Sequence, residues 1–266
     1  MQQEIIPAIG CTEPVAVSLC VAKATQVLGV EPEQIGVILS PNVLKNAMGV
    51  GIPGTGMIGL PIAVALGALI GKPEYGLEVL RDLQPADVER ARQYVQEQRI
   101  KIDVDTEIEE KLYIEVRCFS GNDSSIAVIR GSHTRFSYIG KNGEELLRND
   151  TKGAEEKVEE VPLTFRKVYE FAADSPIDEL EFILEAAKMN REASLQSQKQ
   201  KYGHDVAKSL MGERGRAIFG ENIHSRMISA TAGACDARMD GALIPVMSNS
   251  GSGNQGVAAT LPVLTY

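Results

Sequence analysis

The sequence is poor in the residues that mark several common classes of protein. Only four of its 266 residues are cysteine, too few for a disulfide scaffold. Their spacing contains no CxxC pair, so the sequence encodes no local zinc site. The thiols of Cys11, Cys20, Cys118 and Cys235 are therefore expected to be reduced.

Positive charge and long apolar segments are also scarce. The chain has 27 Lys and Arg against 36 Asp and Glu, a formal net charge of −9. An acidic chain lacks the basic footprint with which nucleic-acid-binding proteins replace counterions. The longest apolar stretch, Met57–Leu69, is shorter than a membrane span, and the first residues lack the pattern of a signal peptide. We therefore expect a cytoplasmic protein with neither a nucleic-acid nor a membrane partner.

The charged residues that are present fall into blocks. No acidic residue lies between Ile35 and Pro73, and no charged residue lies between Gly241 and Tyr266, whereas the middle of the chain is heavily charged. Both quiet segments are rich in glycine and other small residues. This composition fits closely packed backbone around a buried site, and it fits equally a core that simply needs small residues.

Helical signals cover most of the chain. Thr12, Glu13 and Pro14 are typical of a helix start, and Gly29 is typical of its end. Helical spacing or capping signals predict further helices up to residue 69, from residue 85, from residue 177, over 193–210 and over 225–234. The chain is therefore expected to have a mainly helical core.

Strand signals concentrate in the middle of the chain. Strict alternation of apolar residues from Leu112 to Cys118 predicts a half-buried strand, and Asn142-Gly143 predicts a hairpin turn. Other strands are predicted over 34–40, 126–129 and 135–139. We expect an α+β fold, in which residues 1–99 and 151–266 form the helical core and residues 100–150 form a small antiparallel sheet inserted in its middle.

Cys11 is the leading candidate for a catalytic residue. It lies in the motif IGCTEP, directly before the first predicted helix. The positive end of a helix dipole and the unpaired N–H groups there stabilise a thiolate and lower the pKa of the thiol. A nucleophile, a base or a metal ligand needs such a thiol. The alternative is a small buried hydrophobic residue, the commonest role of a free cysteine.

Two polar, glycine-rich segments are candidates for a binding site. They are SPNVLKNAMGVGIPGTG (40–56), in which Lys45 carries the only charge, and SNSGSGNQG (248–256). Backbone N–H groups of such loops can hold a carboxylate or a phosphate, although neither segment completes a phosphate-binding or dinucleotide-binding motif. The alternatives are a structural turn and a flexible linker; the apolar flanks of the second segment favour a binding cradle.

The remaining reactive side chains fit structural positions better. The three histidines are expected at surface or structural positions: His133, His204 and His224. The other three cysteines fit core positions. Asp236, Arg238 and Asp240 are spaced to form an ion-pair network.

Three segments together resemble the cysteine desulfidase family, which is related to the alpha domain of iron–sulfur L-serine dehydratases. They are IGCTEPVAV, SPNVLKNAMGVGIPGTGMIGLPIAVALGA and DARMDGALIPVMSNSGSGNQGVAATLPV. The resemblance implies a serine-dehydratase-alpha-like fold and a lyase that converts L-cysteine to pyruvate, ammonia and sulfide. It also implies a 4Fe-4S cluster whose open iron activates the leaving group. The substrate would be a small amino acid.

The resemblance further assigns roles to residues of this chain. Cys11 matches the cysteine thought to accept the α-proton. The residues implied to line the substrate site are Ser40, Asn42, Lys45, Asn46, Ser248, Asn249, Ser250, Asn254 and Gln255. Within that set, Lys45 is expected to bind the substrate carboxylate and the amides its amino group.

The cluster-binding cysteines of the family have no counterpart in this sequence. They follow the part of the family that resembles it, so the chain is expected to be an N-terminal portion that holds no cluster alone. It would dock with the missing C-terminal part or form a homo-oligomer. Two alternatives stay open: an L-serine dehydratase-type lyase, and a non-catalytic domain that binds a small anion or a partner.

Overall fold

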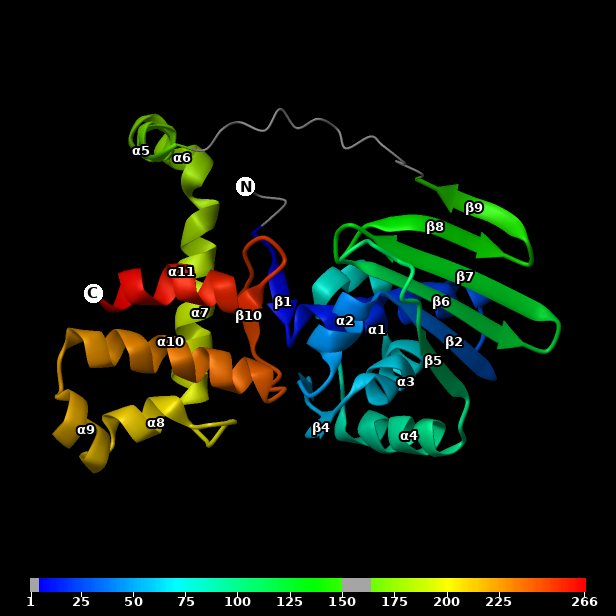
Figure 1. Ribbon diagram of the computed structural model, residues 1–266, viewed down its shortest axis with the longest axis horizontal. Coiled ribbons are helices and arrows are strands. Elements are labelled where there is room, and N and C mark those ends of the chain that lie inside the picture. The colour runs from blue at the N-terminus through cyan, green and yellow to red at the C-terminus, as the bar shows by residue number, and fades with distance from the viewer. Residues whose placement is uncertain (1–4, 150–163) are drawn as a thin grey trace.

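The computed structural model describes residues 5–149 and 164–266. The chain forms two lobes that lie side by side (Figure 1). The N-terminal lobe combines a β-sheet with helices, and the C-terminal lobe consists almost entirely of helices. The predicted α+β class is confirmed.

The sheet of the N-terminal lobe has six strands in the order β5-β2-β6-β7-β8-β9. Their bounds are β2 (Gln34–Leu39), β5 (Ile100–Val104), β6 (Tyr113–Ser120), β7 (Asp123–Arg130), β8 (Phe136–Lys141) and β9 (Glu144–Arg148). The run from β6 to β9 is antiparallel, as expected, but β2 lies between β5 and β6 and pairs with β5 in parallel. The sheet is therefore mixed, and it extends beyond residues 100–150. Ile35, Val37 and Leu39 of β2 are buried in the hydrophobic core, which fits a central position in the sheet.

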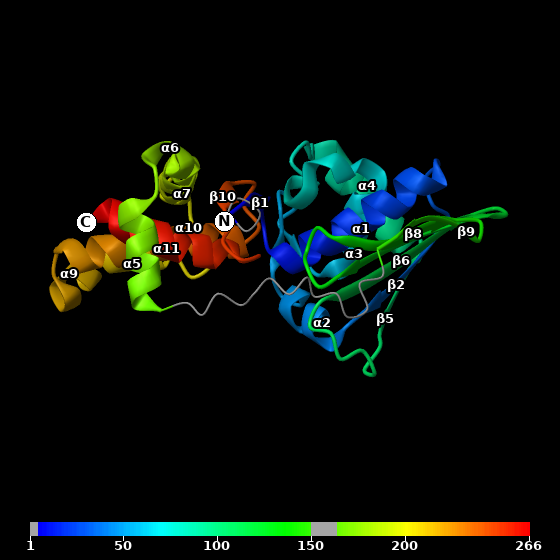
Figure 2. The same cartoon turned by 90° about the horizontal axis from the view of Figure 1, so that it is seen from above.

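Helices cover one face of this sheet (Figure 2). They are α1 (Thr12–Leu28), α2 (Pro41–Ala47), α3 (Leu60–Ile70) and α4 (Pro85–Gln96), with a 3-10 helix, η1 (Pro73–Glu78), before α4. Helix α1 packs on β6 and β7, α3 packs on α1, and α4 packs on α3. The predicted bounds of α1 are confirmed, and Gly29 ends it in the left-handed conformation with φ 90°.

One continuous hydrophobic cluster fills the space between these layers. It runs from Ala8 to Ile129. In β6, Ile114, Val116 and Cys118 are fully buried while the residues between them are more exposed. This confirms the predicted alternation and fixes which face of the strand meets α1.

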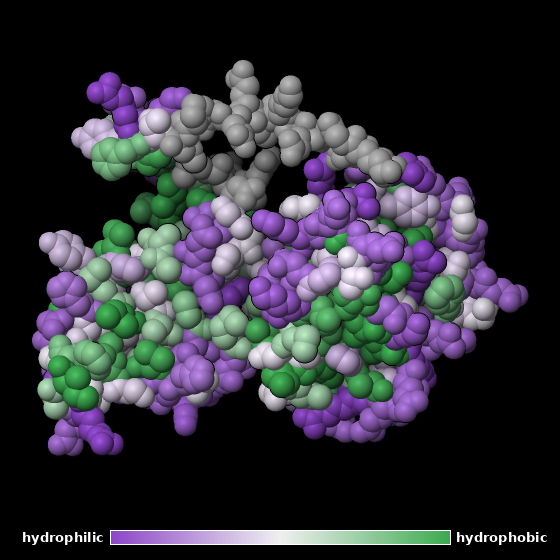
Figure 3. Space-filling model, viewed as in Figure 1, coloured by the Kyte–Doolittle hydropathy of each residue, from purple (hydrophilic) through white to green (hydrophobic). Residues whose placement is uncertain are grey.

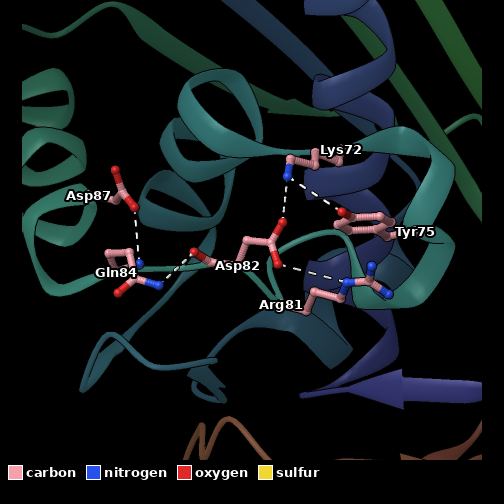
Figure 4. A network of polar contacts seen from close by, with 6 residues as sticks. All are labelled: Lys72, Tyr75, Arg81, Asp82, Gln84 and Asp87. Carbon is pink, nitrogen blue, oxygen red and sulfur yellow. Dashed lines mark hydrogen bonds and ion pairs between the residues drawn. The ribbon is translucent and has the colours of Figure 1, made fainter.

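A polar network ties together the connection from α3 to α4 (Figure 4). Lys72 Nζ lies 2.5 Å from Asp82 Oδ2, and the Arg81 guanidinium stacks 3.4 Å above the ring of Tyr75. Gln84 N donates to Asp87 Oδ2 at 3.0 Å, which closes the capping box of α4. These groups are solvent-exposed, so the network orients the connection more than it stabilises the fold.

The C-terminal lobe contains seven helices within residues 164–266. They are α5 (Phe165–Asp174), α6 (Ile177–Leu180), α7 (Phe182–Ser197), α8 (Val206–Met211), α9 (Glu213–Phe219), α10 (Ile223–Met239) and α11 (Gly253–Thr265). The helix predicted over 193–210 is confirmed only at its two ends and is interrupted between them. The chain leaves α7 at Ser197 and starts α8 at Val206, because Gly203 and Asp205 adopt the left-handed conformation between them.

The two lobes meet along a short β ladder and the glycine-rich loop. Strand β1 (Pro7–Ile9) pairs antiparallel with β10 (Pro245–Met247). The loop contains the hairpin of β3 (Gly51–Ile52) and β4 (Met57–Ile58), and Gly54 N donates to Gly241 O at 2.8 Å. Each lobe buries its own hydrophobic cluster. The expected division into a helical core of residues 1–99 and 151–266 and a sheet of residues 100–150 stays a prediction. Residues 150–163, at that expected boundary, lie outside the described residues.

Candidate functional site

Cys11 lies at the start of α1, where the two lobes meet. It is the N-cap residue of the helix and is buried. Its Sγ donates to Glu13 Oε2 at 3.4 Å, and the Thr12 hydroxyl donates to the same oxygen at 3.0 Å. From α2, Asn46 Nδ2 donates to Glu13 Oε1 at 3.1 Å. The carboxylate of Glu13 therefore joins the IGCTEP motif to the first polar segment.

The Cys11 thiol is held in its protonated form. Burial raises its pKa to about 11, the charge of Arg238 lowers it, and the neighbouring Glu13 carboxylate raises it again. The lowered pKa expected from the helix N-terminus is therefore wrong, because burial and a close anion outweigh the helix dipole. At neutral pH the thiol is a hydrogen-bond donor to Glu13.

Glu13 itself is ionised. Burial alone would raise its pKa, but its own backbone N–H and the hydroxyl and thiol donors of Thr12 and Cys11 outweigh that effect and hold the pKa below its ordinary value. The site thus contains a buried thiol whose proton already points at a carboxylate. At rest the proton stays on sulfur, because the pKa of the thiol lies above that of the carboxylate.

Arg238, on α10, brings a positive charge to this pair from the other lobe. The residue is only 3% exposed, and its Nη1 donates to Asn254 Oδ1 at 2.9 Å at the start of α11. Its charge lowers the pKa of both Cys11 and Cys235, so it lies near both thiols. The sequence-based hypothesis of an ion-pair network with Asp236 and Asp240 is wrong: none of the ion pairs found between described residues includes Arg238.

His133 reaches the same boundary from the turn between β7 and β8. A Cβ added to Gly251 would lie 2.9 Å from His133 Nδ1, so the imidazole packs against the second polar segment. Burial lowers the pKa of His133, and the nearby Glu13 carboxylate only partly opposes this. The ring is neutral at pH 7, and its buried Nε2 has no hydrogen-bond partner among the described residues.

The predicted residues of the first polar segment divide into two groups. Asn46 joins the site through Glu13. Ser40 and Asn42 instead hold the segment before β6, because both side chains donate to Lys111 O, at 3.1 and 3.2 Å. Lys45 is exposed on α2, and no contact between its ammonium group and the site is found in the described part of the chain.

The second polar segment divides in the same way. Asn254 contacts Arg238, whereas the Ser248 hydroxyl donates to Ile6 O at 2.7 Å and fastens the lobes together. Ser250 adopts φ 49° and its hydroxyl donates to Asn249 Oδ1 at 3.1 Å within the loop itself. Gln255 is exposed, and its backbone N–H donates to the helix cap Ser252. The segment is an ordered loop and helix start.

Three residues of the site were missed by the sequence-based assignment. Glu13 could have been predicted from its place in the IGCTEP motif, two residues after Cys11. For Arg238, the sequence predicted only an ion-pair network with Asp236 and Asp240. His133 carried no usable signal, because only the folding of the β7–β8 turn onto the other lobe brings it to Glu13 and Gly251.

The four cysteines do not form a ligand set for an iron–sulfur cluster. Cys20 and Cys118 lie in the core between α1 and the sheet, where Cys20 Sγ contacts the carbonyl of Ala127 at 3.3 Å. Within residues 5–149 and 164–266, no group of three His, Cys, Asp or Glu side chains is arranged to hold a metal ion. In the same residues, no helix is both long and apolar enough to cross a membrane.

The fold and the site define a two-lobed α+β protein with a buried thiol–carboxylate pair at the boundary between its lobes. The chain belongs to the serine dehydratase alpha chain family, whose sequence profile matches residues 74–266. The matched region includes His133, Arg238 and the second polar segment, whereas Cys11 and Glu13 precede it.

Curated relatives match the whole chain, including those first residues. UPF0597 proteins of Bacteroides fragilis and Bacteroides thetaiotaomicron are 58% and 55% identical to it, each over 267 residues. A UPF0597 protein of Porphyromonas gingivalis is 47% identical over 273 residues. These alignments cover 100% of this chain and 62%, 62% and 63% of the respective relatives, so the chain spans about three fifths of their length. No solved structure matches the chain.

Proposed function

We propose that the full-length protein is a lyase that releases sulfide from L-cysteine, and that this chain supplies the groups that hold the substrate and move its α-proton. The observation that carries the proposal is the hydrogen bond from the Cys11 thiol to the Glu13 carboxylate at the boundary between the lobes. Membership of the serine dehydratase alpha chain family supports the reaction class. The same membership favours L-serine as the alternative substrate.

The proposed reaction begins with a proton transfer within the site. The thiol of Cys11 can accept the α-proton only after it has lost its own proton, and Glu13 is the acceptor in direct contact with it. The positive charge of Arg238 stabilises the thiolate that results. Asn46 donates to Glu13 Oε1 and so keeps the other carboxylate oxygen, Oε2, oriented toward the sulfur.

Elimination of the leaving group then follows. The α-proton passes to the sulfur of Cys11, the electron pair of the Cα–H bond forms the Cα–Cβ double bond, and hydrosulfide leaves from Cβ. The enamine product tautomerises to an imine, which water hydrolyses to pyruvate and ammonia. With L-serine, hydroxide leaves in place of hydrosulfide.

In this proposal the implied 4Fe-4S cluster is not a property of the chain alone. The described residues offer no ligand set for it, so its cysteines would come from the remaining two fifths of a protein as long as the relatives. No proton-transfer step described above depends on the cluster.

The C-terminal lobe offers a surface for that remaining part. Apolar side chains gather over α9 and α10 (Figure 3), among them Ile218, Phe219 and Ile228, which are 74%, 61% and 55% exposed. A cleft of about 410 Å³ lies between α7 and α11 and is lined by apolar residues such as Leu184 and Val263. Patches of this kind mark interfaces. The occupant we propose is the segment by which the relatives exceed this chain, since they are longer by about two fifths of their length.

The decisive experiment uses the protein at the full length of its relatives. After anaerobic reconstitution with iron and sulfide, we expect bound iron, cluster absorbance, and pyruvate formed from L-cysteine, with L-serine tested in parallel. The Cys11→Ser and Glu13→Gln variants should lose about 10²- to 10⁴-fold in kcat, the range typical of general acid–base groups. The matched control is Cys235→Ser, which replaces a thiol outside the hydrogen-bonded pair. If the reconstituted protein forms no pyruvate from either amino acid, the proposal is contradicted.

A further inference from the structure

Arg238 is a buried cation whose charge is not balanced within the described residues. A guanidinium has five N–H donors and is rarely buried without an anion. Here Nη1 donates to the neutral amide oxygen of Asn254 and contacts Met239 Sδ at 3.7 Å. Nε is buried and has no hydrogen-bond partner in the parts of the chain that the structure describes. An unpaired buried charge is costly, so a missing anion is the simplest reason for this arrangement.

The start of α11 adds further donors beside the guanidinium. Ser252 caps the helix, since its hydroxyl accepts from Gln255 N at 3.2 Å and its carbonyl accepts from Gly256 N at 3.1 Å. For the backbone N–H groups of Gly253 and Asn254, no acceptor is found among the described residues. Gly253 lies so close to Arg238 that an added Cβ would be 2.3 Å from Nε. The positive end of a 13-residue helix and an unpartnered guanidinium nitrogen therefore meet at one place.

We propose that Arg238 and the first turn of α11 form the binding site for the carboxylate of the amino-acid substrate. The inference rests on the proposed function and names the residue that orients the substrate. A guanidinium binds a carboxylate through two parallel hydrogen bonds, which fixes the plane of the anion. This assignment replaces Lys45, which is exposed on α2.

The position of Cys11 explains why a carboxylate bound there would be productive. The carboxylate carbon of an amino acid is bonded directly to Cα, whose proton Cys11 is proposed to accept. Arg238 lies close enough to Cys11 for its charge to lower the pKa of the thiol. One guanidinium therefore anchors the substrate beside the thiol. A ligand without the carboxylate would lose both the anchor and the alignment.

The test compares two ligands that differ only in the carboxylate. L-Serine and ethanolamine are titrated calorimetrically into the full-length protein, into Arg238→Gln and Arg238→Lys, and into Arg226→Gln as a control on an exposed position of the same helix. Wild-type protein and the control should prefer L-serine by about tenfold or more, the factor that a hydrogen bond to a charged group supplies. Arg238→Gln should lose this preference, and Arg238→Lys should keep only part of it because an ammonium lacks the planar fork.

A second variant keeps the test valid if Arg238→Gln fails to fold. Asn254→Asp places a tethered carboxylate on the existing partner of Nη1, so it should compete with L-serine and weaken its binding without lowering the melting temperature. Undiminished preference for L-serine in folded Arg238→Gln would overturn the inference, as would a wild-type protein without that preference. Binding without pyruvate formation would overturn only the lyase proposal, whereas turnover with an unchanged KM in Arg238→Gln would overturn only the carboxylate site.

Discussion

The N-terminal lobe buries a continuous hydrophobic cluster that runs from Ala8 to Ile129, whereas the buried cluster of the C-terminal lobe consists of five residues. Those five are Ala193, Ala234, Val246, Val257 and Leu261. The C-terminal lobe also carries most of the large apolar side chains that face solvent, and α5 has no buried residue at all. One lobe is closed around its core, and the other keeps apolar surface for a further partner.

The difference follows from how each lobe is layered. In the N-terminal lobe, α1 packs on the sheet, α3 packs on α1, and α4 packs on α3, so successive layers bury the apolar faces between them. In the C-terminal lobe, α10 contacts α7, α8 and α11, and within residues 164–266 the only strand packed on these helices is β10, on α7 and α11. The site lies where these lobes meet: the closed lobe fixes Cys11 and Glu13, and the open lobe brings Arg238 and Asn254.

The largest expected effect comes from matched truncations of a leucine in each lobe. Leu19→Ala removes a side chain that is 1% exposed in α1, and we expect the free energy of unfolding to fall by about 3–5 kcal/mol. Leu195→Ala removes one that is 50% exposed in α7, and its effect should stay within about 0.5 kcal/mol. Urea denaturation of both variants measures the contrast. Equal losses would show that the two lobes are equally well packed.

The second effect tests the contact between the lobes. A Cβ on Gly51 would lie 2.3 Å from the carbonyl carbon of Asp240, so Gly51→Ala should force the lobes apart and cost about 1–3 kcal/mol of stability. Gly36→Ala is the control within the closed lobe. An added Cβ there has no neighbour within 4 Å, so the variant should be neutral or more stable by about 0.5 kcal/mol. Thermal melting of the pair suffices, and a stable Gly51→Ala would contradict the close approach.

The third effect is a loss of stability at alkaline pH. The folded-state pKa of Cys11, about 11, lies above its ordinary value of 9.0, so the folded protein holds this proton more tightly than the unfolded chain. The resulting stability is fully present below pH 9 and is lost as the pH rises to 11, by about 2 kcal/mol. Cys11→Ser should flatten the decline in urea midpoints over that interval. A decline that is unchanged in Cys11→Ser would show that the thiol is not buried beside Glu13.

The smallest effect is expected at the polar network between α3 and α4. Lys72 and Asp82 are both solvent-exposed despite their short contact. Asp82→Asn should therefore leave the melting temperature unchanged within error. Asp87→Asn, which weakens the capping box of α4, should lower it slightly. A larger loss of stability in Asp82→Asn than in Leu19→Ala would show that the polar network, and not the hydrophobic core, stabilises this lobe.

Local sequence signals predicted the elements whose ends depend on a few adjacent residues. Helix α1 begins at Thr12 and stops at Gly29, and β6 follows its alternating pattern, because a cap, a glycine stop and a period of two act within one element. The place of β2 in the sheet could not be predicted in this way. Strand pairing depends on contacts between distant segments. Strand β2 pairs with β5 and β6, which lie more than sixty residues away along the chain.

The sequence by itself determined the α+β class, the bounds of α1, and the position of a thiol at a helix start with a carboxylate two residues later. Only the tertiary structure decided that this thiol is protonated, because its pKa depends on burial and on charges from other elements. Tertiary packing also placed Asn46 beside Glu13 and Arg238 beside Asn254, and it brought His133 near Glu13. A sequence records the kinds of groups that are present. The distances that give them their electrostatic environment exist only once distant segments have packed together.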